Sequence, residues 1–149
     1  MITLKRTDSS HRDFIELVKY LDQFLADLDG KEHAFYATFN TIQALKHVVV
    51  AYEDGISVGC GAFKHLTHES AEIKRMYVSP DHRAKGIAPL ILKELETWAK
   101  ELNHTFCVLE TGKNNPTAVN LYIRLGYEIT PNYGQYIGVA NSVCMKKLL

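Results

Sequence analysis

Apolar residues near the start of the chain recur at the spacing of a helix. The pattern begins after Ser9 and Ser10, either of which can cap a helix, and it stops at Asp29-Gly30. Its apolar positions are Phe14, Leu17, Val18, Leu21, Phe24, Leu25 and Leu28. The alternating run Ile2 to Arg6 before it predicts a short strand. For the segment from Lys31 to Leu45 the pattern is ambiguous, and a second helix is one interpretation of it.

Three strands are predicted in the middle of the chain. The β-branched run His47 to Tyr52 leads into Asp54-Gly55, a hairpin turn signal, and Ile56 to Phe63 follows as the partner strand. Ala71 to Val78 predicts a third strand, and the breaker Ser79-Pro80-Asp81 ends it.

The second half alternates between helices and strands. An amphipathic helix is predicted after Gly86, with one apolar face made of Ile87, Ile91, Leu95, Trp98 and Leu102. A strand from Thr105 to Glu110 follows. Asn115-Pro116 opens a further helix, which Gly126 ends. Tyr127 to Thr130 and Ser142 to Leu148 predict closing strands. We therefore expect one α+β, or mixed α/β, domain over residues 1–149 with a single central sheet.

Composition narrows the classes of partner. Nearly half of the 149 residues are apolar (46%), which is enough for one ordinary core. Lys plus Arg and Asp plus Glu are 17 each, so no general attraction to nucleic acid or to an anionic membrane is expected. The first ten residues do not resemble a signal peptide, and no stretch is apolar enough to span a bilayer. We expect a cytoplasmic protein without nucleic-acid or membrane partners.

The cysteines and histidines give no sign of a disulfide or a metal site. Cys60, Cys107 and Cys144 are far apart, and each lies in an apolar, strand-like run, so we predict buried thiols in a reducing compartment. His65 and His68 are three residues apart, but no third ligand lies near them in the sequence. We therefore expect no metal cofactor.

The most informative segment is a strand, a turn, a glycine and a helix between Glu72 and Ala88. The N-terminus of a helix has unpaired N–H groups and a partial positive charge, so it attracts phosphate. Gly86 has no Cβ, and Arg83 and Lys85 add two cations to the turn. These features suggest a phosphate or pyrophosphate site, although the P-loop and dinucleotide motifs are absent. The alternative is a plain turn with two solvated basic residues.

The spacing of this segment resembles a known family signature. Arg83-x-x-Gly86-x-Ala88 is similar to the R/Q-x-x-G-x-G/A motif of the GCN5-related N-acetyltransferases, the GNAT superfamily. Further along, the segment from Asn115 to Tyr127 resembles the second family motif. The resemblance is clear from about His47 onward and looser before it. Several short segments resemble a subgroup of small bacterial members with unassigned acceptors. Ala84-Lys85 departs from a frequent Arg-Gly in the family.

This resemblance implies a fold and a cofactor. The fold would be a central, mostly antiparallel sheet of six to seven strands, splayed where acetyl-CoA binds and flanked by about four helices. Main-chain groups of the turn would bind the pyrophosphate of acetyl-CoA, and those of the preceding strand would pair with its pantetheine arm. Asn115 would help to hold that arm, or would serve only as a helix cap. The implied cofactor-binding residues are Met76, Tyr77, Val78, Arg83, Ala84, Lys85, Gly86, Ile87, Ala88 and Asn115.

Acetyl transfer to an amine needs groups that handle protons. A primary amine is mostly protonated at neutral pH, so a base must remove a proton before the amine attacks the thioester. By resemblance, Tyr122 is the general acid near the CoA sulfur, and its alternative role is a core aromatic. Glu72 matches the strand glutamate that acts as base in some members, and Glu110 is its rival; each has a purely structural alternative. No Cys–His pair is evident, which favours direct transfer in a ternary complex.

The acceptor is the least determined part of this hypothesis. In this fold, acceptor sites are built from regions that correspond here to Phe35 to Thr41 and Asn132 to Tyr136. Tyr133 and Tyr136 favour a small, partly apolar amine, although a peptide amine and a homodimer are both compatible with the family. Two alternatives stay open: a non-catalytic CoA-sensing or interaction module, and an enzyme with another acyl donor or a hydroxyl acceptor.

Overall fold

The computed structural model describes residues 1–30 and 44–149. Strand β1 (Ile2–Thr7) leads into helix α1 (Arg12–Asp29), which ends at Gly30 as predicted. The cap of α1 is not Ser9 or Ser10 but His11, whose Nδ1 accepts a hydrogen bond from the Asp13 amide at 3.2 Å. The Ser9 hydroxyl is instead used by a long-range contact, because it accepts from the Leu45 amide at 2.9 Å.

The three middle strands form as predicted, and each is one or two residues longer than its pattern indicated. They are β2 (His47–Glu53), β3 (Ile56–His65) and β4 (Ser70–Val78). The β2–β3 turn at Asp54 and Gly55 has positive φ angles of 51° and 84°, as a tight two-residue hairpin requires. A short 3-10 turn, η2 (Pro80–His82), then separates β4 from the following helix.

The second half follows the predicted order. Helix α3 (Ile87–Glu101) is followed by β5 (Phe106–Gly112), α4 (Pro116–Arg124) and β6 (Glu128–Thr130). A second 3-10 turn, η3 (Gly134–Tyr136), precedes β7 (Ser142–Leu148). Asn115 caps α4 through its side chain, and Pro116 occupies the first turn.

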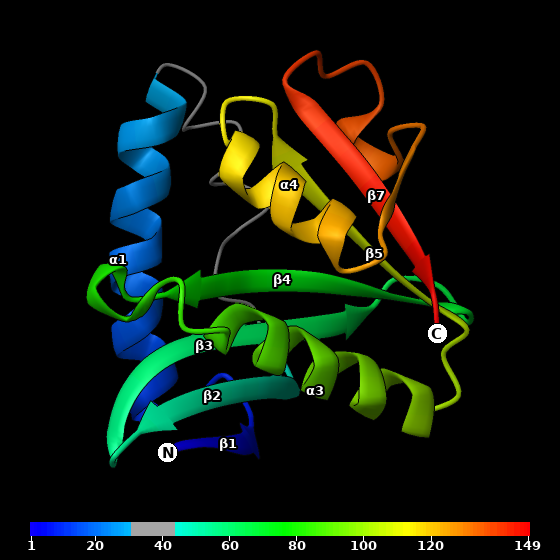
Figure 1. Ribbon diagram of the computed structural model, residues 1–149. Helices are drawn as coiled ribbons and strands as arrows, with labels where there is room; N and C mark the ends of the chain where they lie inside the picture. Colours follow the sequence, from blue (N-terminus) through cyan, green and yellow to red (C-terminus); the bar gives the residue numbers. More distant parts are fainter. Residues whose placement is uncertain (31–43) are drawn as a thin grey trace.

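The strands form one seven-stranded sheet in the order β1-β2-β3-β4-β5-β7-β6. Every neighbouring pair is antiparallel except β4 and β5, which are parallel. That pair holds register only from Ser70↔Phe106 to Glu72↔Val108, and beyond this point the two strands diverge (Figure 1). The sheet is therefore mixed but mostly antiparallel, and it is split between β4 and β5.

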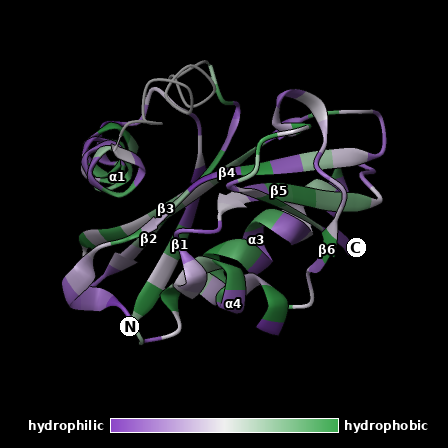
Figure 2. Ribbon diagram, turned by 90° about the horizontal axis from the view of Figure 1, so that it is seen from above, coloured by the Kyte–Doolittle hydropathy of each residue, from purple (hydrophilic) through white to green (hydrophobic). Residues whose placement is uncertain are grey.

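Helices cover both faces of the sheet (Figures 1 and 2). On one face, α1 buries Phe14, Leu17 and Val18 against a core that includes Val50 and Cys60. On the other face, α3 buries Ile91 and Leu95, and α4 adds Tyr122 to the same core. Figure 2 shows the apolar side of α1 turned toward the strands. The split in the sheet thus lies between two helical layers.

Most of the expected architecture is confirmed. The described residues contain three α-helices where the family resemblance implied about four, and most of the ambiguous segment Lys31 to Leu45 falls outside them. Cys60, Cys107 and Cys144 are buried free thiols. None of the helices within 1–30 and 44–149 is both long and apolar enough to cross a membrane.

Candidate active site

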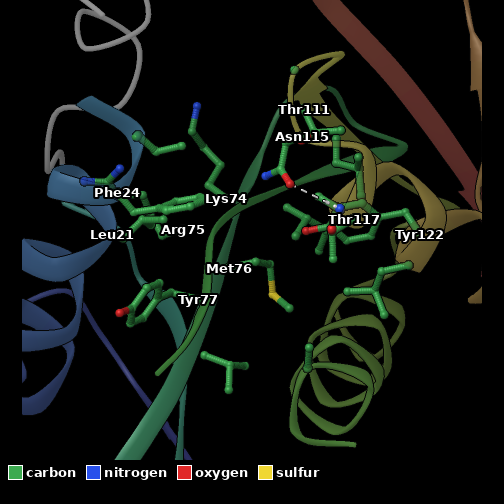
Figure 3. Close-up of a pocket in the computed structure, with 18 of the residues that line it drawn as sticks. Leu21, Phe24, Lys74, Arg75, Met76, Tyr77, Thr111, Asn115, Thr117 and Tyr122 are labelled. Carbon is green, nitrogen blue, oxygen red and sulfur yellow. Dashed lines mark hydrogen bonds between the residues drawn. The ribbon is translucent and has the colours of Figure 1, made fainter. Parts of the chain in front are cut away.

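A large cavity fills the split between β4 and β5. Its volume is about 1010 Å³, and it extends from α1 on one face of the sheet to the N-terminus of α3 on the other. Figure 3 shows Leu21, Phe24 and Arg75 on the α1 side, with Thr111, Asn115 and Tyr122 across β4 from them. One cavity therefore has access to both faces of the sheet.

A β-bulge shapes the wall that β4 gives to this cavity. The register with β3 shifts between Cys60 and Ala62, and Arg75 takes a positive φ of 60°. Figure 3 shows Met76 and Tyr77 on opposite sides of the strand after the bulge. Because β5 has already diverged, the β4 segment from Ile73 to Val78 has no strand partner on that side within the described residues. Its main chain can pair with an extended ligand.

The turn before α3 presents main-chain donors at the other end of the cavity. Ala84 and Gly86 have positive φ angles of 62° and 78°, and nothing lies within 4 Å of the position of a Cβ on Gly86. The first bond of α3 runs from the Leu90 amide to the Gly86 carbonyl, so the amides of Ile87 and Ala88 precede the helical ladder. The turn therefore has the open main-chain donors that a phosphate site needs, and phosphate binding at these amides stays a prediction.

The two basic side chains of the turn are exposed to solvent, but each also contacts another part of the fold. Arg83 Nε donates to the Val78 carbonyl at 2.9 Å, and its guanidinium lies 5.8 Å from the ring centroids of both Phe24 and Tyr77. Lys85 Nζ lies 3.4 Å from Glu53 Oε2. Arg83 therefore connects the turn to α1 and β4.

Asn115 and Tyr122 line the cavity from α4. The Asn115 side chain accepts from the Ala118 amide at 3.3 Å, so its role as a helix cap is real (Figure 3). Tyr122 is 8% exposed, and its ring packs edge-on against Tyr127 with centroids 5.8 Å apart. Burial raises the pKa of the Tyr122 phenol above its usual value, which keeps the hydroxyl protonated as a hydrogen-bond donor.

Glu72 and Glu110 lie on the same face of the sheet. Glu72 pairs with Val108 in parallel register, and Glu110 is two residues beyond Val108, so the alternation of strand side chains turns both carboxylates the same way. Both line the cavity. This face is the α1 side, opposite to the face on which Tyr122 packs. The sheet thus separates the tyrosine from the carboxylates, and the split joins them.

The environments of the two carboxylates differ. Glu72 Oε2 accepts from the Tyr133 hydroxyl at 2.6 Å, and Glu72 Oε1 lies 3.6 Å from Lys74 Nζ and 3.7 Å from Lys64 Nζ. One oxygen of each carboxylate, Glu72 Oε1 and Glu110 Oε2, is buried without a hydrogen-bond partner among the described residues. Glu110 has less support, because the lysines of the described residues form ion pairs with Glu72 and not with Glu110. Burial, as the largest cause, raises the pKa of Glu110 to about 7, and a hydrogen bond from Ser142 opposes that rise.

Some cavity residues could not be found by sequence pattern. Lys74 and Arg75 line the α1 side, and ordinary strand alternation would have placed them on opposite faces. The bulge brings both side chains to the α1 side of the cavity, and the bulge is recognised only from the shift in register between β3 and β4. Tyr136, from the predicted acceptor loop, also lines the cavity, whereas Phe35 to Thr41 lies outside the described residues. Within those residues, no group of His, Cys, Asp and Glu side chains has the arrangement of a metal site.

Comparison with known protein families shows which family has this split sheet. The model of the Acetyltransferase (GNAT) family matches residues 14–127, which span the split sheet, the α3 turn and α4. The chain therefore belongs to the GNAT acetyltransferase family.

The relatives agree with this assignment. An IAA acetyltransferase from Azospirillum brasilense is 29% identical over 150 residues, covering 99% of this chain and 98% of that protein. An uncharacterised N-acetyltransferase of Bacillus subtilis, YsnE, is 34% identical over 66% of this chain and 67% of its own length. A Klebsiella pneumoniae structure named as an acyl-CoA N-acyltransferase has a TM-score of 0.80 and 29% identity, with 100% and 98% coverage. A family member from Elizabethkingia anophelis, solved with acetyl-CoA bound, has the same fold, with a TM-score of 0.70, 20% identity and coverage of 99% and 98%.

The pKa of Glu110 predicts how stability depends on pH. Folding raises this pKa from 4.5 to about 7, so between these values the folded protein binds more protons than the unfolded chain. The stabilisation is fully present below pH 4.5 and is lost as the pH rises through 7. Relative to Glu110→Gln, the wild type should lose on the order of 1–3 kcal/mol across this window. Urea unfolding at pH 5, 6, 7 and 8 measures the difference.

The exposed Glu128→Gln on β6 is the matched control. It should follow the wild type at every pH. If the free-energy difference between the wild type and Glu110→Gln is the same at pH 5 and pH 8, then Glu110 ionises normally in the folded protein.

Proposed function

We propose that this chain is a single-domain N-acetyltransferase that moves an acetyl group from acetyl-CoA to the primary amine of a small molecule. The observation that carries the proposal is the cavity through the split sheet. It places helix N-terminal amides and Tyr122 at one end and two carboxylates at the other. A thioester that enters from the α3 side would meet an amine that enters from the α1 side.

The chain has suitable groups for each part of acetyl-CoA. The amides of Ile87 and Ala88, with the open space at Gly86, suit the pyrophosphate. The unpaired edge of β4 at Met76, Tyr77 and Val78 suits the amide groups of the pantetheine arm. Acetyl-CoA supplies the activated acyl group as a thioester. Family members solved with acetyl-CoA or CoA support this assignment of the cosubstrate.

The reaction that follows is a direct acyl transfer. The amine lone pair attacks the thioester carbonyl, the carbon–sulfur bond breaks, and the amine nitrogen gives up a proton. The CoA thiolate leaves more easily when a donor stabilises its charge. Tyr122 suits this role, because its high pKa keeps its proton on the oxygen as a hydrogen-bond donor. The three cysteines are buried, which favours direct transfer over an acyl-enzyme.

Of the two carboxylates, Glu110 is the better general base. A base is most effective when its pKa is close to the working pH, and burial brings the pKa of Glu110 to about 7. Its Oε2 has no hydrogen-bond partner within residues 1–30 and 44–149, so it can accept a proton from the amine or from a bridging water. Glu72 is already engaged by Tyr133 and two lysines, which suits a structural role.

Two other functions remain as alternatives. A CoA-sensing module would need the cofactor site but not the pair of Tyr122 and Glu110, and the presence of both favours an enzyme. An enzyme with a longer acyl donor or a hydroxyl acceptor would use the same groups, and competition between donors in one assay separates it from an acetyltransferase.

Binding of the cosubstrate is the first expected result. Acetyl-CoA at about 100 times its dissociation constant should stabilise the fold by roughly 2.7 kcal/mol and raise the midpoint of thermal unfolding by several degrees. CoA should act similarly, and ATP much less. The absence of a shift at millimolar acetyl-CoA would overturn the acetyltransferase proposal. An equal shift with ATP would mean that the turn before α3 is a general phosphate site.

Removal of the Tyr122 hydroxyl should affect the chemical step. Tyr122→Phe should retain acetyl-CoA binding and lower kcat by about 10- to 1000-fold, the loss expected for a proton donor at the leaving group. Tyr127→Phe is the matched control, because it deletes a neighbouring phenol hydroxyl that bonds to Glu96 at 2.8 Å and does not line the cavity. Equal turnover in wild type and Tyr122→Phe would remove Tyr122 from the mechanism.

The two carboxylates should differ in their effect on the pH profile. In the wild type, kcat/KM should rise with pH through an apparent pKa near 7, because the base must be ionised. Glu110→Gln should lose this limb and about 100-fold or more in rate, while Glu72→Gln should retain the limb. The ionisation of the acceptor amine adds a separate limb at higher pH. Loss of the limb in Glu72→Gln alone would make Glu72 the base.

A further inference from the structure

The α1 side of the cavity contains a buried guanidinium whose hydrogen-bonding capacity is largely unused. Arg75 lies at the β4 bulge and lines the cavity, and only 3% of its side chain is exposed. Its Nη2 donates to Asp22 Oδ1 at 2.8 Å. Its Nε and Nη1 are both buried, and neither has a hydrogen-bond partner among residues 1–30 and 44–149. Figure 3 shows Arg75 beside Leu21 and Phe24 on this side of β4.

Such a group is expensive to bury unless an anion completes its bonds. A guanidinium stays charged at any pH at which a protein is folded, so it cannot escape the cost by losing a proton. Asp22 is a weak counter-ion because its side chain is 49% exposed and therefore well solvated. Two of the three guanidinium nitrogens have no partner in the part of the chain that the structure describes. A carboxylate is the anion whose planar pair of oxygens best matches this planar set of donors.

The other carboxylates that line the cavity do not fill this role. Glu72 is paired with Tyr133 and with lysines. Asp29 accepts from Asn114 Nδ2 at 3.4 Å. Glu110 is held near half-protonation at neutral pH by its burial. The unused donors of Arg75 are therefore available to an anion other than these three carboxylates.

The wall around Arg75 defines the rest of the ligand. The part of α1 that lines the cavity is apolar, and Tyr136 adds an aromatic ring from the late loop; the apolar lining residues of α1 are Leu21, Phe24, Leu25 and Leu28. An acceptor that fits this region has a carboxylate for Arg75 and an apolar body. Its amine must also reach the carbonyl of the thioester.

We propose that the acceptor is an amine that carries a carboxylate, of the class of α-amino acids with apolar or aromatic side chains, and that Arg75 binds this carboxylate. The proposal rests on the proposed acetyltransferase function and specifies its substrate. The amine of such an acceptor points toward Glu110, and its side chain lies against α1. Polyamines and other multiply cationic amines are poor acceptors, because they bring positive charge next to Arg75.

Matched acceptors test the charge requirement directly. Leucine and phenylalanine are each compared with their α-amides, which retain the amine and the side chain but lack the negative charge. Wild-type enzyme should prefer the acid over the amide by about 30-fold or more in kcat/KM, as expected for a buried, hydrogen-bonded charge pair. In Arg75→Gln this preference should disappear, mainly through a higher KM for the acid, while kcat/KM for the amide changes little.

A second variant separates recognition of the acceptor from a structural role of Arg75. Asp22→Asn breaks the ion pair that joins α1 to β4 but leaves the guanidinium in place. It should retain the preference for the acid. If Asp22→Asn and Arg75→Gln lose that preference equally, Arg75 acts only by holding α1, and the proposal is wrong. Should Arg75→Gln fail to fold, the acid-to-amide ratios of wild type and Asp22→Asn decide the question.

The thermal shift with acetyl-CoA keeps this proposal distinct from the broader one. If acetyl-CoA gives no shift, the acetyltransferase proposal itself fails. If acetyl-CoA binds but the amides or spermidine are acetylated as well as the acids, the enzyme remains an acetyltransferase and the role of Arg75 is refuted. If acetyl-CoA binds and none of the acids is acetylated, the carboxylate-bearing class is likewise refuted.

Discussion

The loss of pairing between β4 and β5 is the feature on which the rest of the site depends. The two strands hold parallel register for three positions and then separate. Among the described residues, each strand therefore has an edge without a strand partner where the sheet would otherwise be continuous. A free edge inside a protein is costly unless something pairs with it. Here the edges border a cavity that reaches both faces of the sheet. The sheet therefore has a built-in passage between its two helical layers, through which two substrates can meet from opposite sides.

The same split gives two similar carboxylates different properties. Glu72 lies at the last paired position of β4 and β5, where Tyr133 and lysines surround it. Glu110 lies beyond that position, still paired through its own strand with β7 but facing the cavity with one oxygen unpartnered. Burial raises the pKa of Glu110 more than Ser142 and Lys74 lower it, whereas Tyr133 and two lysines lie against Glu72. Position relative to the split, more than residue type, distinguishes the two side chains.

Helix α1 links the two ends of the cavity. It contacts the turn before α3 through Arg83, whose guanidinium lies near Phe24 and Tyr77. It contacts the β4 bulge through Asp22 and Arg75. Near its C-terminus, the Leu28 carbonyl accepts from Asn114 Nδ2 at 3.2 Å, which ties it to the loop before α4. A shift of this helix would therefore alter the turn before α3 and the wall of the cavity at the β4 bulge together.

The sequence alone determined the order of the elements, because hydrophobic periodicity and turn residues are local signals. It also located the turn at Gly86 and the candidates Tyr122, Glu72 and Glu110, whose spacing follows the family motifs. Local signals could not identify the cap of α1. His11 caps the helix, and the Ser9 hydroxyl bonds instead to the Leu45 amide, which is distant in the sequence.

Only the tertiary structure decided three features of the site. These are the bulge at Arg75, the position of Lys74 and Arg75 on one side of β4, and the different environments of Glu72 and Glu110. Each depends on strand register, and on burial between segments far apart in the chain. Strand register and burial are not encoded in the spacing of residues along one strand.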